Sequence, residues 1–373
     1  MTTYVGARVP RLDSTAKVTG RAVYGVDVTL PGMLHGAVVR SPYPHARIVS
    51  ISTGEAENFP GVEAVVTGRD FPHLHGSAIQ DQPYLAIDRV RHAGEPVVAV
   101  AATTEHAAQE AARLVRVEYE ELPALLDMRE ALADTAPLVH PELHSYSRGS
   151  HEIVPHTNIN TLYRLAKGDV VAGFAAADLI VEGEYTANAL SHAALEVHVA
   201  VARYEPDTAG YTLWVSTDRP FFLRDEIAGS LGLDSTDVRL IVAAVGGSFG
   251  GKGIPIAEAI AIALARHAGG RPVRVELSRE EDLVASQHRV PAIMKLKTGV
   301  TRGGMLTARS AEIIWDSGAY TAYTVGVAIR GSQTIVGPYR IPNVELLSRQ
   351  VYTNRPVTGS YRGYGTTQVT WAC

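Results

Sequence analysis

The hydrophobic pattern of the first third of the chain predicts short strands separated by turns. Apolar runs bounded by turn residues predict strands over residues 23–28, 34–41, 46–53, 62–68, 95–102 and 115–122. One helix is predicted over residues 103–114, because Thr103 or Thr104 can cap its first turn and alanines run through its middle. This order of elements predicts a small mixed α+β domain over residues 15–125.

The pattern changes twice in the rest of the chain. Residues 126–165 carry prolines, histidines and hydroxyl side chains without a sustained period, which predicts a connector that lies over a neighbouring domain. Residues 166–373 return to a strand-rich pattern, so the fold class is α+β. The strands expected there cover residues 179–187, 197–205, 210–217, 238–245, 271–277, 292–300 and 308–320, and the helices cover residues 220–233 and 257–270.

The stretch VGGSFGGKG, residues 245–253, lies between a predicted strand and a predicted helix. It satisfies seven positions of the phosphate-binding motif G-x-x-x-x-G-K-[ST], but Gly253 replaces the Ser or Thr that would bind magnesium. Ser248 also replaces the second glycine of the dinucleotide-binding motif. A loop with this many glycines lets its backbone approach a ligand closely. Because both nucleotide-binding motifs are incomplete, the pattern favours a ligand other than a nucleoside triphosphate. A nucleotide hydrolase and a plain turn remain alternatives.

A second glycine stretch, GSYRGYGTTQ at residues 359–368, follows about one hundred residues later. With both stretches in this order, the chain resembles the molybdenum-binding subunit of the xanthine dehydrogenase and aldehyde oxidase family of molybdenum hydroxylases. The resemblance covers nearly the whole chain. VYGVDVTLPGMLHGAVVRSPYPHARI is similar to the start of the family's α/β hammerhead domain, and KGDVVAGFAAADLIVEGEY to the entry into its first molybdopterin domain. The resemblance therefore implies a hammerhead domain over residues 15–125, a connector over residues 126–165, and a first molybdopterin-binding domain over residues 166–373.

The resemblance also implies where the cofactor binds. Both motifs would contact molybdopterin, and the family's arginine of the second motif falls on Arg362. The implied cofactor-binding residues are Gly246, Gly247, Ser248, Phe249, Gly250, Gly251, Arg362, Gly363, Tyr364 and Gly365. Arg330 falls where purine-oxidising members have a substrate-facing arginine, and a structural role for Arg330 is the alternative. No side chain of this chain is expected to bind the metal directly.

Three positions depart from members of the family. Gly253 stands where purine-oxidising members carry a glutamate that contacts substrate, which places xanthine itself in doubt. Leu190 falls where several members have a glutamine near the metal. The second motif lacks the cysteine that marks the carbon-monoxide-oxidising branch. Glu196 matches a common family glutamate and is interpreted as structural.

The resemblance ends just past the second glycine motif, whereas family members continue into a second cofactor domain. That part holds most of the dinucleotide contacts and the glutamate general base, so no catalytic residue is assigned in this chain. The chain is expected to be a truncated reading frame or one piece of a split subunit, and to be inactive alone. The implied activity is oxidation of an N-heterocycle or aldehyde with water as oxygen source. A noncatalytic fragment or assembly module and an aromatic thioester reductase of the same family remain alternatives.

The composition of the chain limits the kinds of binding partner and the cellular location that are expected. A net charge of −5 over 373 residues gives no electrostatic case for nucleic acid, and no apolar run is long enough to span a membrane, so a cytoplasmic location is expected. Cys373 is the single cysteine, which excludes an iron–sulfur cluster held by this chain. Iron–sulfur and FAD centres are therefore expected on partner subunits, beside a chain that carries the second molybdopterin domain. The resemblance implies the cytosine dinucleotide form of the cofactor. Two histidine pairs, His73 with His75 and His140 with His144, are not expected to bind metal because no carboxylate supports them.

Overall fold

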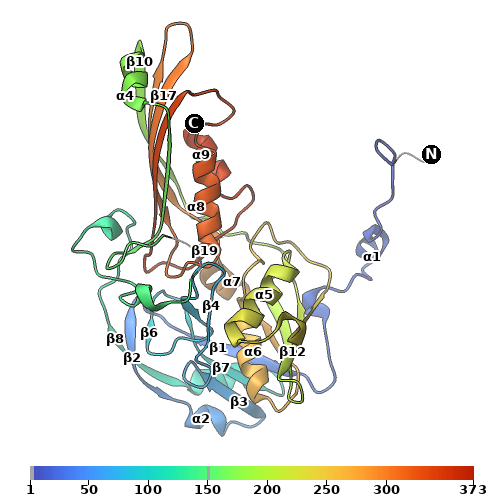
Figure 1. Cartoon of the computed structure of the whole chain (residues 1–373). Coiled ribbons are helices and arrows are strands. Elements are labelled where there is room, and N and C mark those ends of the chain that lie inside the picture. The colour runs from blue at the N-terminus through green and yellow to red at the C-terminus, as the bar shows by residue number, and fades with distance from the viewer. Residues whose placement is uncertain (1–3, 149–151) are drawn as a thin grey trace.

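The structure is a computed structural model of the chain and describes residues 4–148 and 152–373. Figure 1 shows a rounded body, a tall sheet that rises from it, and an N-terminal segment that projects to one side. The large sheet of the body is built from residues 34–102 and 199–276, whereas the tall sheet is built from residues 159–351.

A seven-stranded sheet joins the N-terminal region (residues 15–125) to the C-terminal region (residues 166–373). Its strand order is β13-β12-β11-β14-β1-β7-β3. The strands are β1 (Leu34–Arg40), β3 (Val62–Thr67), β7 (Pro96–Ala102), β11 (Val199–Glu205), β12 (Gly210–Val215), β13 (Val238–Val242) and β14 (Val273–Glu276). The two regions meet where β1 runs parallel to β14, with Leu34 opposite Val273. The regions predicted from the sequence as separate domains thus share one sheet.

Helices cover both faces of this sheet. Along β7, Val98 and Val100 belong to the apolar cluster that includes residues of α3 (Glu105–Leu114), and Ala99 and Ala101 belong to the cluster around α6 (Ala257–His267). Burial on both faces explains the continuous apolar run of this strand. The α6 helix is buried from Ala257 to Ala265. None of the helices in the described ranges is both long and apolar enough to cross a membrane.

The tall sheet has five strands in the order β10-β16-β17-β18-β9. Its strands are β9 (Ile159–Lys167), β10 (Leu179–Ala187), β16 (Ala292–Val300), β17 (Leu306–Asp316) and β18 (Asn343–Val351). Two helices, α8 (Thr324–Gln333) and α9 (Thr366–Ala372), pack along it around the buried Trp315. Residues next to the second glycine motif are therefore supported by this sheet.

The remaining elements are short apart from α5. They are α1 (Ser14–Val18), a 3-10 turn (Gly25–Asp27), α2 (Gly54–Glu57), α4 (Val170–Ala175), α5 (Pro220–Leu231), α7 (Arg279–Ala285) and 3-10 turns at Glu130–Leu132, Leu143–Ser145 and Ser235–Asp237. The strands are β2 (Ala46–Ser52), β4 (Leu74–His75), β5 (Gln82–Pro83), β6 (Arg89–Val90), β8 (Arg116–Glu121), β15 (His288–Arg289) and β19 (Thr358–Gly359).

Most predicted strands and all three predicted helices are confirmed, with ends shifted by a few residues. The strand predicted over residues 23–28 is wrong, because Gly25–Asp27 forms a 3-10 turn. The Tyr24 N–H donates to the Asp27 carboxylate, and the Gly25 N–H donates to Glu196. These two side-chain acceptors satisfy donors that a strand would have paired with a neighbour.

The predicted connector, residues 126–165, contains the start of β9, which the pattern does not predict. The rest of it packs through Met128, Val139 and Leu143 into an apolar cluster with residues of the tall sheet. His140 is buried there, and its ring nitrogens lie 2.9 Å from the Tyr146 hydroxyl and 2.6 Å from the Ala319 carbonyl oxygen. These partners give His140 a structural role. No group of three or more potential metal ligands occurs among the described residues.

A buried carboxyl group links the N-terminal region to the turn after β17. Asp81 accepts hydrogen bonds from the Thr321 N–H at 2.9 Å and the Tyr352 hydroxyl at 2.7 Å. Burial raises the pKa of Asp81 from 3.8 to about 6, although these hydrogen bonds oppose the increase. The native state therefore binds the Asp81 proton more tightly than the unfolded chain does.

We expect Asp81→Asn to remove a pH dependence of stability between pH 3.8 and about 6. In the wild type, Asp81 destabilises the fold by about 3 kcal/mol as pH rises through this window, because the buried acid must ionise. Asparagine keeps the shape and does not titrate. Urea unfolding at pH 4, 5, 6 and 7 should show the variant gaining stability relative to the wild type as pH rises. Equal pH slopes for the two proteins would contradict the assignment.

Candidate functional site

The first glycine motif forms a loop between β13 and α6. Gly247 and Gly250 have φ values of 109° and 96°, and Phe249 between them has a φ of 55°. A side chain at Gly246 would collide with the Cβ of Glu196. The Ser248 carbonyl oxygen accepts a hydrogen bond of 2.8 Å from the Gly251 N–H, which closes the loop on itself. The glycines are therefore required by the conformation of the loop and by its close packing.

Three consecutive backbone donors in this loop are free. Within residues 4–148 and 152–373, the N–H groups of Gly247, Ser248 and Phe249 have no hydrogen-bond partner. Consecutive amides in a glycine-rich turn can converge on an anion. Phe249 is 44% exposed, so this part of the loop faces outward. The loop can thus donate hydrogen bonds to an anionic ligand at the surface of the chain.

The second glycine motif lies directly against the first. The Arg362 N–H donates to the Phe249 carbonyl oxygen at 2.9 Å, and the Arg362 guanidinium lies 5.0 Å from the centre of the Phe249 ring. The Gln287 side-chain amide donates to the carbonyl oxygen of Gly250 at 2.5 Å and to that of Ser360 at 3.5 Å. Arg362 itself is exposed. The fold therefore brings the two motifs into one surface with a cationic side chain beside the free amides.

Two histidines contact carbonyl oxygens of the loops that carry the glycine motifs. The His192 ring lies 2.7 Å from the Ser360 carbonyl oxygen. The His198 ring lies 3.0 Å from the Gly251 carbonyl oxygen and 2.6 Å from Asp282. Burial would raise the pKa of Asp282, but its hydrogen bonds with His198 outweigh this and lower it.

Lys252 points into the protein, not toward a ligand. Its ammonium lies 2.7 Å from the Glu196 carboxylate, and the two residues are 3% and 7% exposed. Glu196 also accepts hydrogen bonds from the Gly25 N–H at 2.9 Å and the Gly246 N–H at 2.8 Å. Burial opposes ionisation, but hydrogen bonds from Lys252 and Ser216 lower the pKa of Glu196 overall. A phosphate-binding lysine must present its ammonium to the ligand. Lys252 instead forms a buried ion pair with Glu196, and the Glu196 carboxylate in turn binds Gly25 of the N-terminal region.

The remaining predicted residues lie near the junction of the two motifs. Gly365 has a φ of 71°, and a side chain there would collide with the Val327 carbonyl oxygen of α8. Tyr364 packs edge-on against Tyr323, with ring centres 6.2 Å apart. Arg330 is exposed on α8, between Val327 and Gly331, the two helix residues that lie close to Gly365. The structure thus places Arg330 on the helix beside the second motif, and its role stays a prediction.

Several supporting residues carry no sequence signal. Gln287 and His192 lie outside both motifs and contact them only through the fold. Arg219 donates to the Ser360 hydroxyl at 3.3 Å and its guanidinium lies 4.2 Å from the centre of the Tyr323 ring. These side chains are identified only by their contacts with segments far away in the chain, and a single sequence does not show such contacts.

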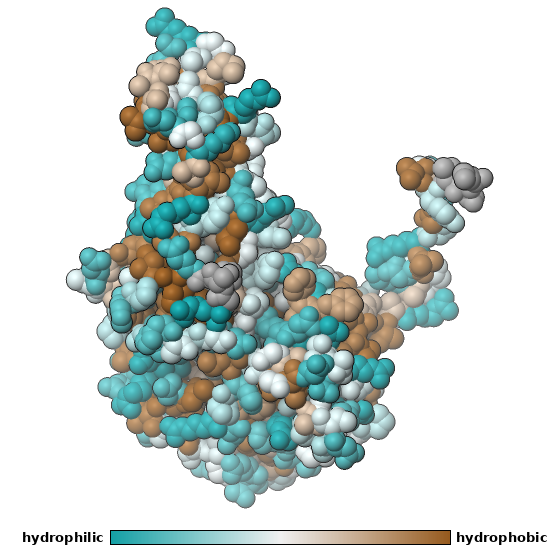
Figure 2. Space-filling view, in the orientation of Figure 1, coloured by the Kyte–Doolittle hydropathy of each residue, from teal (hydrophilic) through white to brown (hydrophobic). Residues whose placement is uncertain are grey.

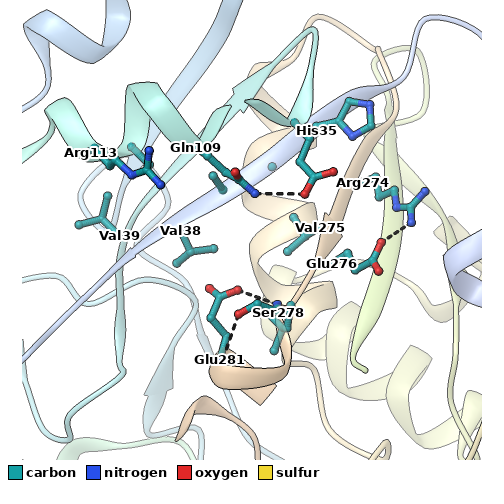
Figure 3. A pocket seen from close by; sticks show the side chains of 15 residues that line it. His35, Val38, Val39, Gln109, Arg113, Arg274, Val275, Glu276, Ser278 and Glu281 are labelled. Carbon is teal, nitrogen blue, oxygen red and sulfur yellow. Dashed lines mark hydrogen bonds and ion pairs between the residues drawn. The ribbon is translucent and has the colours of Figure 1, made fainter. Parts of the chain in front are cut away.

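Two cavities lie away from the glycine motifs. One, of about 490 Å³, lies over β1 and β14 between α3 and α7, and its wall carries charged side chains such as Arg113, Arg274 and Glu281 (Figure 3). The other, of about 600 Å³, lies where Arg40 faces Asp316 and Pro356. Neither is lined by a residue of the two glycine motifs.

Comparison with known proteins matches both regions of the chain. Residues 19–123 match the a/b hammerhead domain of aldehyde oxidase and xanthine dehydrogenase, and residues 150–373 match the molybdopterin cofactor-binding domain. The crystal structure of quinoline 2-oxidoreductase from Pseudomonas putida 86 superposes with a TM-score of 0.85 at 33% identity, covering 96% of this chain and 46% of that one.

Two relatives differ in how much of their length this chain covers. The nicotinate dehydrogenase large molybdopterin subunit of Eubacterium barkeri is 37% identical over 98% of this chain and 82% of its own length. The xanthine dehydrogenase molybdenum-binding subunit of Escherichia coli O157:H7 is 33% identical over 97% of this chain but only 48% of its own length. The chain spans about half the length of the longer relatives.

Proposed function

Because this chain belongs to the aldehyde oxidase and xanthine dehydrogenase family, with a hammerhead domain followed by a molybdopterin-binding domain, we propose that it is the molybdopterin-binding subunit of a molybdenum hydroxylase. The substrate class is an N-heterocycle or an aldehyde, with water as the source of oxygen. Two relatives named for N-heterocycles, nicotinate dehydrogenase and quinoline 2-oxidoreductase, support the first of these classes.

The observation that carries the proposal is the contact between the two glycine motifs. Molybdopterin is an anionic group that requires backbone donors and a nearby positive charge. The free amides of Gly247, Ser248 and Phe249 and the exposed Arg362 beside them fit this requirement. When bound, the cofactor supplies the two-electron redox chemistry of the reaction.

The residues of this chain bind and orient the cofactor. The amides of the first loop would donate hydrogen bonds to it, and Arg362 would add a charge-assisted contact. Gln287 and the Glu196–Lys252 pair keep the loops in place, so that the donors are oriented before the ligand arrives. We assign no catalytic proton transfer to a residue of this chain.

Exposed apolar side chains near the loop support the proposal that a further chain binds here. Leu195 is 93% exposed and follows Ala194, whose side chain lies beside Gly247. Phe221 and Phe222 at the start of α5 are 70% and 69% exposed. Figure 2 shows further apolar side chains along the tall sheet and on the side of the body nearest the N-terminal segment. We assign this surface to a chain that carries the second molybdopterin domain.

The finer assignments follow from the same proposal. The cofactor is in its cytosine dinucleotide form, and the iron–sulfur and FAD centres lie on partner subunits in the cytoplasm. The relative in Eubacterium barkeri, called a large molybdopterin subunit and mostly covered by this chain, supports a divided subunit.

Molybdenum content tests the proposal. We expect the protein purified from its native cells to carry about one molybdenum atom per chain together with a second polypeptide, and an Arg362→Met form to lose most of the metal. Metal analysis and mass spectrometry of the purified complex measure both. A matched Arg302→Met variant, at an exposed turn away from the motifs, should keep its metal. A chain without molybdenum and without a companion would instead indicate a truncated fragment with no activity.

A further inference from the structure

The cavity of about 600 Å³ lies between the hammerhead domain and the molybdopterin-binding domain. Arg40 lines the cavity from the hammerhead domain. The molybdopterin-binding domain contributes Leu283 and Val284 of α7, together with Pro291 and Asp316. The volume lies in the range of small-molecule sites, and such sites combine mostly apolar walls with a few polar groups. This cavity has that composition.

A buried carboxylate at the wall of this cavity has an unused acceptor. Asp316 is completely buried, and one of its oxygens accepts hydrogen bonds from the Gly318 N–H at 2.9 Å and the Thr353 hydroxyl at 2.7 Å. The other oxygen, Oδ2, has no hydrogen-bond partner among the described residues. The first two bonds hold the carboxylate in one orientation, and an unpaired buried acceptor is costly.

A guanidinium lies close to this acceptor without bonding to it. Arg355 Nη1 is 4.0 Å from Asp316 Oδ2, beyond hydrogen-bond distance, and its side chain is 47% exposed. Asp316 Oδ2 is itself shielded from solvent, so a ligand reaches it only when a neighbouring side chain moves, and Arg355 is the half-exposed neighbour beside it. Arg40 of the hammerhead domain lines the same cavity. Its guanidinium lies 2.9 Å from Glu281 and donates to the Gly94 carbonyl oxygen at 3.2 Å, while its Nη2 has no partner among the described residues. The unused acceptor of Asp316 therefore lies beside one guanidinium, that of Arg355, in a cavity that Arg40 also lines.

This arrangement selects the chemistry of a ligand. A cation at Asp316 would be repelled by Arg355, and an anion would be repelled by Asp316. A neutral group that carries an N–H donor next to a carbonyl acceptor satisfies both side chains, and an apolar ring fits against Leu283, Val284 and Pro291. We propose that this interdomain cavity is a second ligand site, which binds neutral cyclic amides (lactams) through Asp316 and Arg355.

The simplest probe is 2-pyridone, whose ring carries adjacent N–H and carbonyl groups. Titration of the purified complex, followed by ligand-observed NMR, should show binding of 2-pyridone and none of N-methyl-2-pyridone, which lacks the donor. Arg355→Met should weaken binding roughly tenfold or more, because a hydrogen bond to a charged group is lost. Asp316→Asn should do the same, because its amide replaces the free acceptor with a donor.

Two further comparisons keep the proposal open to refutation. Val284→Trp places a large ring in the cavity while Asp316 and Arg355 stay unchanged in sequence, and it should abolish binding. This variant tests the proposal even if Asp316→Asn does not fold. Molybdenum content should be unchanged in Arg355→Met, which separates this site from the cofactor surface. Equal binding of both pyridones, or binding unaffected by Arg355→Met and Val284→Trp, overturns the proposal, and so does the absence of 2-pyridone binding at millimolar concentration.

Discussion

Glu196→Ala is expected to destabilise the protein by about 3–5 kcal/mol, because it leaves a buried ammonium without its partner. Lys252 is 3% exposed, and the Glu196 carboxylate 2.7 Å away is the only counter-charge within 4.0 Å among the described residues. The variant also removes the acceptor for the N–H groups of Gly25 and Gly246. Urea unfolding of the variant and the wild type measures the difference.

Two controls separate the ion pair from general effects of substitution. The exposed pair Lys297–Glu182, at 2.9 Å, should contribute only about 0–1 kcal/mol, so Lys297→Met should change stability little. The double variant Glu196→Ala with Lys252→Met should be less destabilised than the sum of the two single variants, because no charge is left unpaired. A cost for Glu196→Ala as small as that for Lys297→Met would contradict the buried pair.

Gly365→Ala is expected to destabilise the protein by about 2–5 kcal/mol and to lower its molybdenum content. The φ of 71° costs an alanine about 1–2 kcal/mol. The added methyl also collides with the Val327 carbonyl oxygen, and overpacking of this kind costs about 1–3 kcal/mol. Relief of the collision must move the second glycine motif away from α8. Thermal unfolding and metal analysis of the same preparation check both effects.

Gly304→Ala is the matched control for this substitution. Gly304 has a φ of 80°, but a side chain there meets no heavy atom within 4 Å. It should therefore cost only the backbone term of about 1–2 kcal/mol and leave the molybdenum content unchanged. If the two variants show the same loss of stability and the same molybdenum content, the close approach of α8 to the second motif does not affect cofactor binding.

Local elements of the fold could be predicted because they follow from short-range chemistry. The helix with Thr104 as its cap is confirmed, with the Thr104 hydroxyl accepting from the Ala107 N–H at 3.1 Å. The strands around β7 and β16 are also confirmed, since runs of apolar residues bounded by turns carry this information. The family was also predicted correctly, because the two glycine motifs occur in a specific order and spacing.

Other features were missed because they depend on distant partners. The strand predicted at residues 23–28 is a turn, since Glu196 accepts the Gly25 N–H from another part of the chain. The β9 strand was not predicted, because it lies at the edge of the sheet and its partner strand, β18, is far away in sequence. Gln287 carries no motif, yet it bonds to both loops.

The sequence by itself determined many of the strands, three of the helices, the two glycine motifs and the family to which they belong. Gly247 and Gly250 stand out in the sequence, and their φ values of 109° and 96° favour glycine independently of the distant residues that also crowd them. The tertiary structure alone decided that β1 pairs with β14, that the free amides lie beside Arg362, and that Lys252 is buried against Glu196. These are contacts between segments far apart in the chain, and their formation depends on the packing of the whole molecule, which no local pattern encodes.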